Sequence, residues 1–485
     1  MMDDMITGYK PEKLFHFFEE ISAIPRGSKN EKAISDYLVK FAQERGLWYH
    51  QDQLYNVIIK KKGSKGAEEL PAVMLQGHID MVCEKNADVE HDFFKDGLKL
   101  IVNDGKLMAD GTTLGADNGV AVALMLMVMD DEDIVHPPLE CVFTTQEEIG
   151  LNGAAALDKS LISARTMINM DSEEEGIATV SCAGGLRIAC SKNIEKEHLE
   201  GVLLKISISN LMGGHSGSDI DKERQNANIL MARILYRLIK ETNGNIVSIN
   251  GGNKDNAIPR ECKATVIYQD WQEAKKAEKI AVDLSREIHE EIIAGEPDFS
   301  YDISLGEGKA DALSKKDGMD FVSIIYLAPN GVQKRNMEMN GFVETSSNMG
   351  VVSTMEDSVM VMFSPRSSIA SSMEYMKERI KLLADIFGYR YSFSGEYPGW
   401  NYVEESKIRE IFQESYEILF HQKMKMEAIH AGLECGLFSA ALPGLDAIAV
   451  GPTICECHTP NEYLPLDSFE RFYKLLKEVL LRLTK

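Results

Sequence analysis

The sequence contains 485 residues, more than one ordinary hydrophobic core accommodates, so two or three domains are expected. Its formal net charge of -24 argues against nucleic acid or an anionic membrane as a partner, because both would repel the chain. Eight scattered cysteines are not a disulfide framework for a protein of this size and favour a reducing cytoplasm. We find no signal-peptide core and no run near the roughly 20 apolar residues of a membrane span, so we expect neither secretion nor insertion.

The first part of the chain alternates between helical and strand patterns. Apolar residues recur at about 3.6-residue spacing in segments 11–24 and 30–46, which predicts two amphipathic helices. Strand patterns follow at 55–61, 72–76, 139–145 and 165–170, with a buried helix at 117–131 between them. Strands that alternate with helices predict a mixed, mostly parallel sheet covered on both faces, and hence an α/β fold.

The pattern changes near residues 181–187. From there to about residue 400, long amphipathic helices such as 224–241 and 273–293 are mixed with alternating strands. The tail then returns to the first style, with helices at 405–420 and 466–483 and strands at 425–430 and 445–451. We therefore expect a discontinuous α/β domain, residues 1–186 and 398–485, interrupted by a large inserted α+β domain, residues 187–397.

Acids and histidines follow the predicted strands of the first style. His78 and Asp80 come after strand 72–76, Glu147 and Glu148 after 139–145, and Asp171 after 165–170. His458 lies beyond strand 445–451, and Asp117 lies in the glycine-rich "LGADNGVA" where a helix begins. Because ligands of open α/β sheets bind outside the carboxyl ends of the strands, these side chains are expected at one edge.

Two histidines and several carboxylates form the mixed nitrogen and oxygen ligand set that catalytic zinc accepts, and manganese or cobalt could use it too. His78 and Asp80 point the same way in an extended segment, so Asp80 can orient a metal-binding His78. The consecutive Glu147 and Glu148 cannot share a direction, which favours one ligand and one proton shuttle. Two metals would need a bridging carboxylate, for which Asp117 is the best candidate. Such a pair activates water for amide or peptide hydrolysis.

Seven segments together resemble the co-catalytic dinuclear zinc peptidases and amidohydrolases, the family of aminoacylases, carnosinases and bacterial carboxypeptidases. They are "GHIDMVCEK", "TTLGADNGVAVA", "TTQEEIGLNGA", "NMDSEEEG", "LMGGHSGSDI", "AIHAGLECG" and "ECHTPNE", and they run in the family's order from residue 77 to 462. The resemblance therefore covers nearly the whole chain.

The resemblance implies a role for each matching position. The first domain would be catalytic and the inserted domain a lid. His78 and Asp171 would hold one divalent metal, zinc in this family, and Glu148 and His458 the other, with Asp117 as the bridge. Glu147 would be the general acid/base that activates a metal-bridging water, and Asp80 would orient His78. Family members also carry a cis peptide after the bridging aspartate, here Asp117–Asn118. The implied substrate-binding residues are His215, which would stabilise the oxyanion, and Asn256, Arg366 and Gly432.

Three functions are weighed. A dipeptidase that hydrolyses unblocked dipeptides, including Xaa-His substrates such as β-alanyl-histidine, is favoured by the large lid and by "GHIDMV" and "HAGLECG". An aminoacylase or carboxypeptidase of the same fold is the alternative. A catalytically dead binding protein is disfavoured because all seven catalytic and ligand positions hold the expected residue type.

Cys455, Cys457 and His458 do not make a zinc finger, since no second pair with finger spacing follows. The lid could supply His215 within one chain, so a homodimer is possible but not required.

Overall fold

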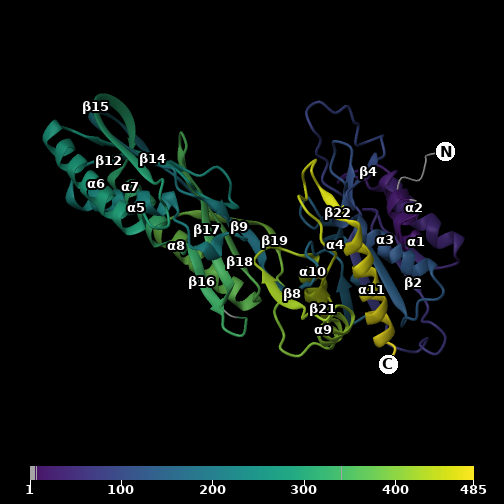
Figure 1. The fold of residues 1–485 in the computed structure, drawn as a ribbon. Helices are drawn as coiled ribbons and strands as arrows, with labels where there is room; N and C mark the ends of the chain where they lie inside the picture. Colours follow the sequence, from purple (N-terminus) through teal and green to yellow (C-terminus); the bar gives the residue numbers. More distant parts are fainter. Residues whose placement is uncertain (1–5, 7, 340) are drawn as a thin grey trace. The chain divides into compact units, whose positions relative to one another are not determined.

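The structure is a computed structural model that describes residues 6, 8–339 and 341–485. It divides into two compact units (Figure 1). The first unit comprises Met1–Ser181, Trp400–Ala428 and Leu433–Lys485, and the second comprises Cys182–Gly399 and Ile429–Gly432. The sequence analysis puts the changes of domain at 186/187 and 397/398, a few residues from these bounds, and assigns no part of 429–432 to the second domain.

An eight-stranded mixed sheet forms the centre of the first unit. Its strands, in spatial order, are β1 (Trp48–Gln51), β2 (Val57–Lys61), β6 (Leu139–Thr144), β3 (Val73–His78), β7 (Thr166–Asn169), β21 (Asp446–Ala449), β8 (Ile177–Cys182) and β20 (Lys425–Ile429). The mixed sheet of the predicted α/β fold is confirmed. The pairs β6–β3, β3–β7 and β7–β21 are parallel, and the pairs β1–β2, β2–β6 and β21–β8 are antiparallel. Strands β3 and β6 are buried at every position, as expected for strands covered on both faces.

Helices surround this sheet. They are α1 (Glu12–Ser22), α2 (Lys32–Glu44), α3 (Ala116–Asp130), α4 (Asn152–Ala156), α9 (Lys407–Phe420), α10 (Glu434–Ala441) and α11 (Leu466–Arg482). Helix α3 contacts both strand β3 and helix α1. Residues 118–129 of α3 are all buried, so the helix has no polar face there. The prediction of a buried helix there is confirmed. Strands β4 (Leu100–Asn103), β5 (Lys106–Ala109) and β22 (Tyr463–Pro465) form a separate small sheet.

The second unit is built on a nine-stranded sheet. Its strands are β15 (Ser300–Leu313), β10 (Lys196–Ser209), β14 (Cys262–Tyr268), β12 (Asn245–Gly251), β17 (Phe342–Thr354), β18 (Ser358–Ser367), β9 (Gly184–Asn193) and β19 (Arg390–Tyr397), with β16 (Gly331–Asn336) beside β17. All of these pairings are antiparallel. Strands β11 (Gly214–His215) and β13 (Ala257–Ile258) form a two-stranded sheet of their own.

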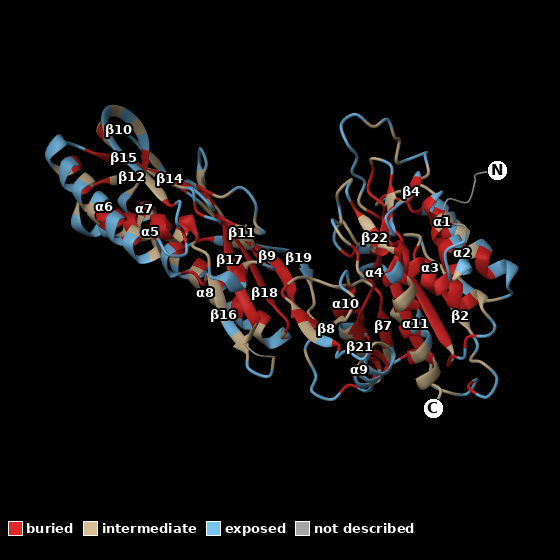
Figure 2. Cartoon of the chain, in the orientation of Figure 1, coloured by how far each residue is buried: buried red, intermediate tan, exposed pale blue. Residues whose placement is uncertain are grey.

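Four long helices belong to the second unit: α5 (Ala227–Glu241), α6 (Trp271–Ile292), α7 (Lys315–Leu327) and α8 (Ala370–Phe387). The helices predicted at 224–241 and 273–293 are α5 and α6. Each begins at a side-chain cap, because Asn226 accepts from the amide of Asn228 and Asp270 from that of Glu273. Figure 2 shows the buried residues gathered along the sheets and the inward sides of the helices in each unit. Within the described residues, no helix combines the length and apolarity that a bilayer span requires.

Candidate metal centre

The carboxyl ends of the central parallel strands carry the predicted ligands of the first unit. His78 is the last residue of β3, Asp171 follows the end of β7 by two residues, and the turn with Glu147 and Glu148 follows β6. His458 lies in the loop between β21 and β22. Parallel strands that lie side by side end at the same edge, so these segments meet although they are far apart in sequence.

Asp117 lies between two histidines. Its Oδ1 is 3.0 Å from His78 Nε2, and its Oδ2 is 3.1 Å from His458 Nε2. Asp171 Oδ1 is 3.4 Å from His78 Nε2, and Glu148 Oε2 is 3.1 Å from His458 Nε2. Two groups of three predicted ligands therefore share Asp117, with the ligand atoms of each group within 4.8 Å of one another, and a third group joins Asp117 to Glu173 and Cys457.

The charges at this edge fit divalent cations. Four carboxylates, those of Asp117, Glu147, Glu148 and Asp171, surround two imidazoles, and Glu148 Oε1 is buried without a hydrogen-bond partner among the described residues. Burial disfavours a charged His78, yet Asp171 and Asp117 raise its pKa well above the usual value. Hydrogen bonds to Asp117 and Glu148 raise the pKa of His458 to about 11. The acids thus favour positive charge at both imidazoles, where metal ions would replace the protons.

Glu147 differs from the other acids in its contacts. Its Oε2 is 3.9 Å from His78 Nε2, beyond hydrogen-bond distance. Burial and the neighbouring acids, Asp171 first among them, raise its pKa well above the usual value, against the opposing charge of His78. A carboxyl group with a raised pKa beside a ligand cluster is suited to accept and return a proton near neutral pH.

Asp80 connects His78 to the turn that carries the two glutamates. His78 Nδ1 lies 3.1 Å from the backbone carbonyl of Asp80 and 3.4 Å from its Oδ1, so the ring turns Nε2 toward Asp117. The same carboxylate accepts the amide of Glu147 at 3.1 Å, the amide of Glu148 at 3.4 Å and the hydroxyl of Ser28 at 2.8 Å. Asp80 therefore fixes both a histidine and the neighbouring acids, a link that the sequence analysis did not contain.

Glu462 holds the segment around Asp117, and the sequence analysis gave it no role. Its carboxylate accepts the amides of Leu114, Gly115, Ala116 and Asp117 at 2.8–3.3 Å. The peptide bond Asp117–Asn118 is cis, as the resemblance implied. Glu462 closes the quoted "ECHTPNE", so the motif contained the residue but not its distant partners.

Arg26 is a second contributor that the sequence analysis missed. Its guanidinium is buried and donates to the carbonyls of Ile79, Asp80 and Gly115. A Cβ at Gly119 would lie 2.8 Å from Arg26 Nη2, so this second glycine of "GADNG" leaves room for the guanidinium. Arg26 thus connects the segment after β3 with the start of α3.

The second unit brings together its predicted substrate-binding residues. His215 in β11 pairs with Ala257 in β13, next to Asn256, whose carbonyl accepts the amide of Ser216 at 2.9 Å. His215 Nδ1 accepts the amides of Gly217 at 3.3 Å and Ser218 at 3.2 Å, so the proton of the neutral ring is on Nε2. Burial and the charge of Arg366 lower the pKa of His215, which keeps the ring neutral.

Arg366 and Gly432 both lie next to the side chain of Tyr397. Arg366 in β18 is 7% exposed and donates through Nη1 to Tyr397 Oη at 3.1 Å. A Cβ at Gly432 would lie 2.6 Å from Tyr397 Cε2. The sequence analysis did not name Tyr397. Only the strand pairing, which no local pattern shows, brings it beside Arg366.

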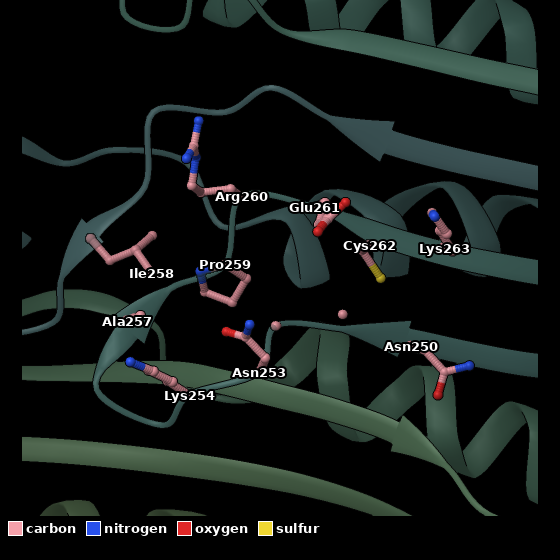
Figure 3. Close-up of a pocket in the computed structure, with 12 residues that line it drawn as sticks. Asn250, Asn253, Lys254, Ala257, Ile258, Pro259, Arg260, Glu261, Cys262 and Lys263 are labelled. Atoms are coloured by element: carbon pink, nitrogen blue, oxygen red, sulfur yellow. The ribbon is translucent and has the colours of Figure 1, made fainter. Parts of the chain in front are cut away.

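A separate cavity of about 450 Å³ in the second unit is lined by residues of segment 250–263, which contains the end of β12, β13 and the start of β14 (Figure 3). Its lining includes Lys254, Arg260, Glu261 and Lys263, around the turn that also contains Asn256. Among the described residues that line it, none belongs to the predicted site.

The comparisons with known proteins agree with the motifs. A family model described as peptidase family M20/M25/M40 matches residues 74–482, most of the chain, and the chain belongs to this family of peptide-bond hydrolases. It is 36% identical to the cytosol non-specific dipeptidase of Escherichia coli (strain K12) over 480 residues, 98% of each protein. The crystal structure of aminoacylhistidine dipeptidase from Vibrio alginolyticus matches with a TM-score of 0.94 and 35% identity, over 98% of this chain and 97% of that one. The predicted family is confirmed.

A more distant match shows the fold alone. A tripeptidase from Staphylococcus aureus has a TM-score of 0.55 at 17% identity, over 98% of this chain and 99% of that one.

Proposed function

We propose that the protein is a metal-dependent dipeptidase that hydrolyses unblocked dipeptides, including Xaa-His substrates such as β-alanyl-histidine. The observation that carries this proposal is the pair of ligand groups that share Asp117, with Glu147 beside them. The similarity to the dipeptidases of Escherichia coli and Vibrio alginolyticus over nearly the full chain supports the substrate class. The first unit is the catalytic domain and the second the lid domain.

Five residues would hold two divalent cations, most suitably zinc: His78, Asp117, Glu148, Asp171 and His458. Imidazole and carboxylate ligands without thiolate suit zinc, and also manganese or cobalt. When bound, the cations supply positive charge that polarises the scissile carbonyl and acidifies water. Asp117, whose two oxygens face the two histidines, would contribute to both sites.

Glu147 is the general acid/base of the reaction. Its carboxylate accepts a proton from the attacking water and returns it to the leaving amine. Asp80 holds the backbone of Glu147 and the ring of His78, so it positions both for the reaction.

The second unit binds the substrate. His215 donates its Nε2 proton to the oxyanion that develops at the scissile carbonyl, because its Nδ1 already accepts two backbone amides. Arg366 binds the substrate carboxylate through its planar guanidinium group. Asn256 and Gly432 also belong to the substrate-binding site. The Escherichia coli relative bears "cytosol" in its name, and we propose the cytoplasm as the location of this protein too.

The decisive experiment removes the proton acceptor alone. Glu147→Ala should retain both metal ions and lose turnover about 10²- to 10⁴-fold, the usual contribution of general acid–base catalysis. Glu174→Ala, at an exposed position, is the matched control and should behave as wild type. Metal content and dipeptide turnover are measured on the same samples. Near-normal turnover of metal-loaded Glu147→Ala would contradict the assignment of Glu147 as the general acid/base. Efficient hydrolysis of N-acetylated amino acids by the wild type would favour an aminoacylase.

A further inference from the structure

Three neighbouring strands of the second unit place Arg366, Gly185 and Tyr397 in one row. Gly185 in β9 pairs with Arg366 in β18 on one side and with Tyr397 in β19 on the other. Residues opposite one another in neighbouring strands share a face of the sheet. Since Gly185 has no side chain, Tyr397 reaches across the middle strand to Arg366.

Two glycines make room for the tyrosine ring. A Cβ at Gly185 would lie 2.7 Å from Tyr397 Oη, and one at Gly432 would lie 2.6 Å from Cε2. Both distances are shorter than real Cβ contacts. Neither glycine is among the described residues with positive φ, so space and not backbone conformation requires glycine here. The ring of Tyr397 is therefore held in one position by its surroundings.

The hydrogen bond between the two side chains leaves useful groups free. Arg366 Nη1 donates to Tyr397 Oη at 3.1 Å, which occupies a lone pair of the phenol oxygen and leaves its proton available. Arg366 Nε is buried and has no hydrogen-bond partner among the described residues. The positive charge of Arg366 also acts on its surroundings, since it contributes with burial to the lowered pKa of His430 and His215. A cation and a free phenolic proton at one place suit a carboxylate.

We propose that Tyr397 is a substrate-binding residue that donates its phenolic proton to the carboxylate bound by Arg366, and that Gly185 and Gly432 are small because Tyr397 occupies their side-chain space. This inference rests on the proposed function, in which the substrate presents a carboxylate. Arg366 and Tyr397 then recognise the C-terminus of a dipeptide together, and the tyrosine also keeps the guanidinium in place.

The test compares a free dipeptide with the same dipeptide as its C-terminal amide. Tyr397→Phe removes only the hydroxyl and should raise the KM for alanyl-alanine about tenfold to a hundredfold, since a hydrogen bond to a charged group is lost. Its kcat should stay within about twofold, and kcat/KM for alanyl-alanine amide should be unchanged. Tyr391→Phe, the same change on the same strand, is the control and should match wild type on both substrates.

A second variant tests Tyr397 by crowding its ring and not by removing its hydroxyl. Gly432→Ala places a methyl group against the ring and should reproduce the KM effect with the free acid. Tyr397→Phe alone decides the matter if Gly432→Ala does not fold. An equal loss on acid and amide, or no change on either, overturns the inference.

The wild type distinguishes the two levels of the proposal. Absent turnover of dipeptides, together with hydrolysis of N-acetylated amino acids, contradicts the dipeptidase. Those substrates also carry a carboxylate, so the KM effect of Tyr397→Phe is then measured on them. Normal dipeptide turnover with an unaltered KM in Tyr397→Phe contradicts only the role of Tyr397.

Discussion

The two compact units bring polar side chains together by different routes. In the first unit, His78, Glu147 and Asp171 follow the ends of neighbouring parallel strands, so strand ends alone collect them at one edge. In the second unit, Arg366 and Tyr397 face each other across an antiparallel strand, and their meeting depends on register. The order of residues along the chain therefore predicts the first arrangement and not the second.

Each unit also contains a close histidine–aspartate pair, and their surroundings differ. His458 Nε2 is 3.1 Å from Asp117 Oδ2 within a cluster of acids, whereas His198 Nδ1 is 2.8 Å from Asp311 Oδ1 at a site where both side chains are 65% exposed. An exposed ion pair such as His198–Asp311 contributes little to stability. The His458–Asp117 pair lies beside further carboxylates and can therefore bind a cation. The histidine alone does not distinguish them.

The largest effect is expected when this contrast is tested by substitution. His458→Ala should lower the bound metal from about two ions to one and reduce turnover about a thousandfold, because a cation contributes several kcal/mol to the stabilisation of the transition state. His198→Ala should keep both metals and wild-type turnover. Elemental analysis and dipeptide hydrolysis on both variants provide the measurement. A fully metallated His458→Ala would contradict the ligand assignment.

A smaller effect is expected at Asp80. Asp80→Asn retains the size of the side chain but places an amide where the carboxylate accepts two backbone amides and the Ser28 hydroxyl. Residues that orient metal ligands typically contribute tenfold to a hundredfold, so kcat at saturating metal should fall by about that factor. Ser28→Ala removes one of these hydrogen bonds and should cost only a few-fold. If kcat in Asp80→Asn stays within twofold of wild type, Asp80 does not act through His78 and Glu147.

Much of the first unit could be predicted from the sequence, for a physical reason. Residues 118–129 of α3 are buried, β3 and β6 are buried at every position, and all three segments are mostly apolar, so their patterns predict buried elements. The acids Asp171, Glu147 and Glu148 follow the ends of such strands. Residues that act through distant partners could not be found in this way. Glu462 accepts amides more than 340 positions away, and Arg26 binds carbonyls 53–89 positions away, so no local spacing reveals them. Tyr397 was missed because register, not local sequence, sets its neighbours.

Glu434 provides the finest test of how the strand ends are supported. It begins α10 and is fully buried, and its Oε2 accepts the hydroxyl of Thr144 at 2.8 Å and the amide of Gln76. Gln76 in turn accepts from Asn169 Nδ2 at 2.6 Å. Thr144, Gln76 and Asn169 lie at or near the ends of β6, β3 and β7, so this network connects the three strands beneath the ligands.

The network predicts a pH dependence of stability. Burial and the Asp171 carboxylate, against the charge of His78, raise the pKa of Glu434 from the usual 4.5 to about 7. A raised pKa in the folded state means that the folded protein holds this proton more tightly than the unfolded chain. The contribution to stability is therefore complete below about pH 4.5 and is lost as pH rises through about 7.

Glu434→Gln should flatten this dependence in the metal-free protein. Its free energy of unfolding, measured by urea denaturation in chelator at intervals from pH 4.5 to pH 8, should change less with pH than that of the wild type. Thr144→Val is the matched variant, because it removes a hydrogen bond that lowers the pKa of Glu434 and should move the loss of stability to higher pH. A wild-type slope in Glu434→Gln would show that the proton is bound elsewhere, and the acids at the strand ends, Asp171 and Glu147, would then be the groups that titrate.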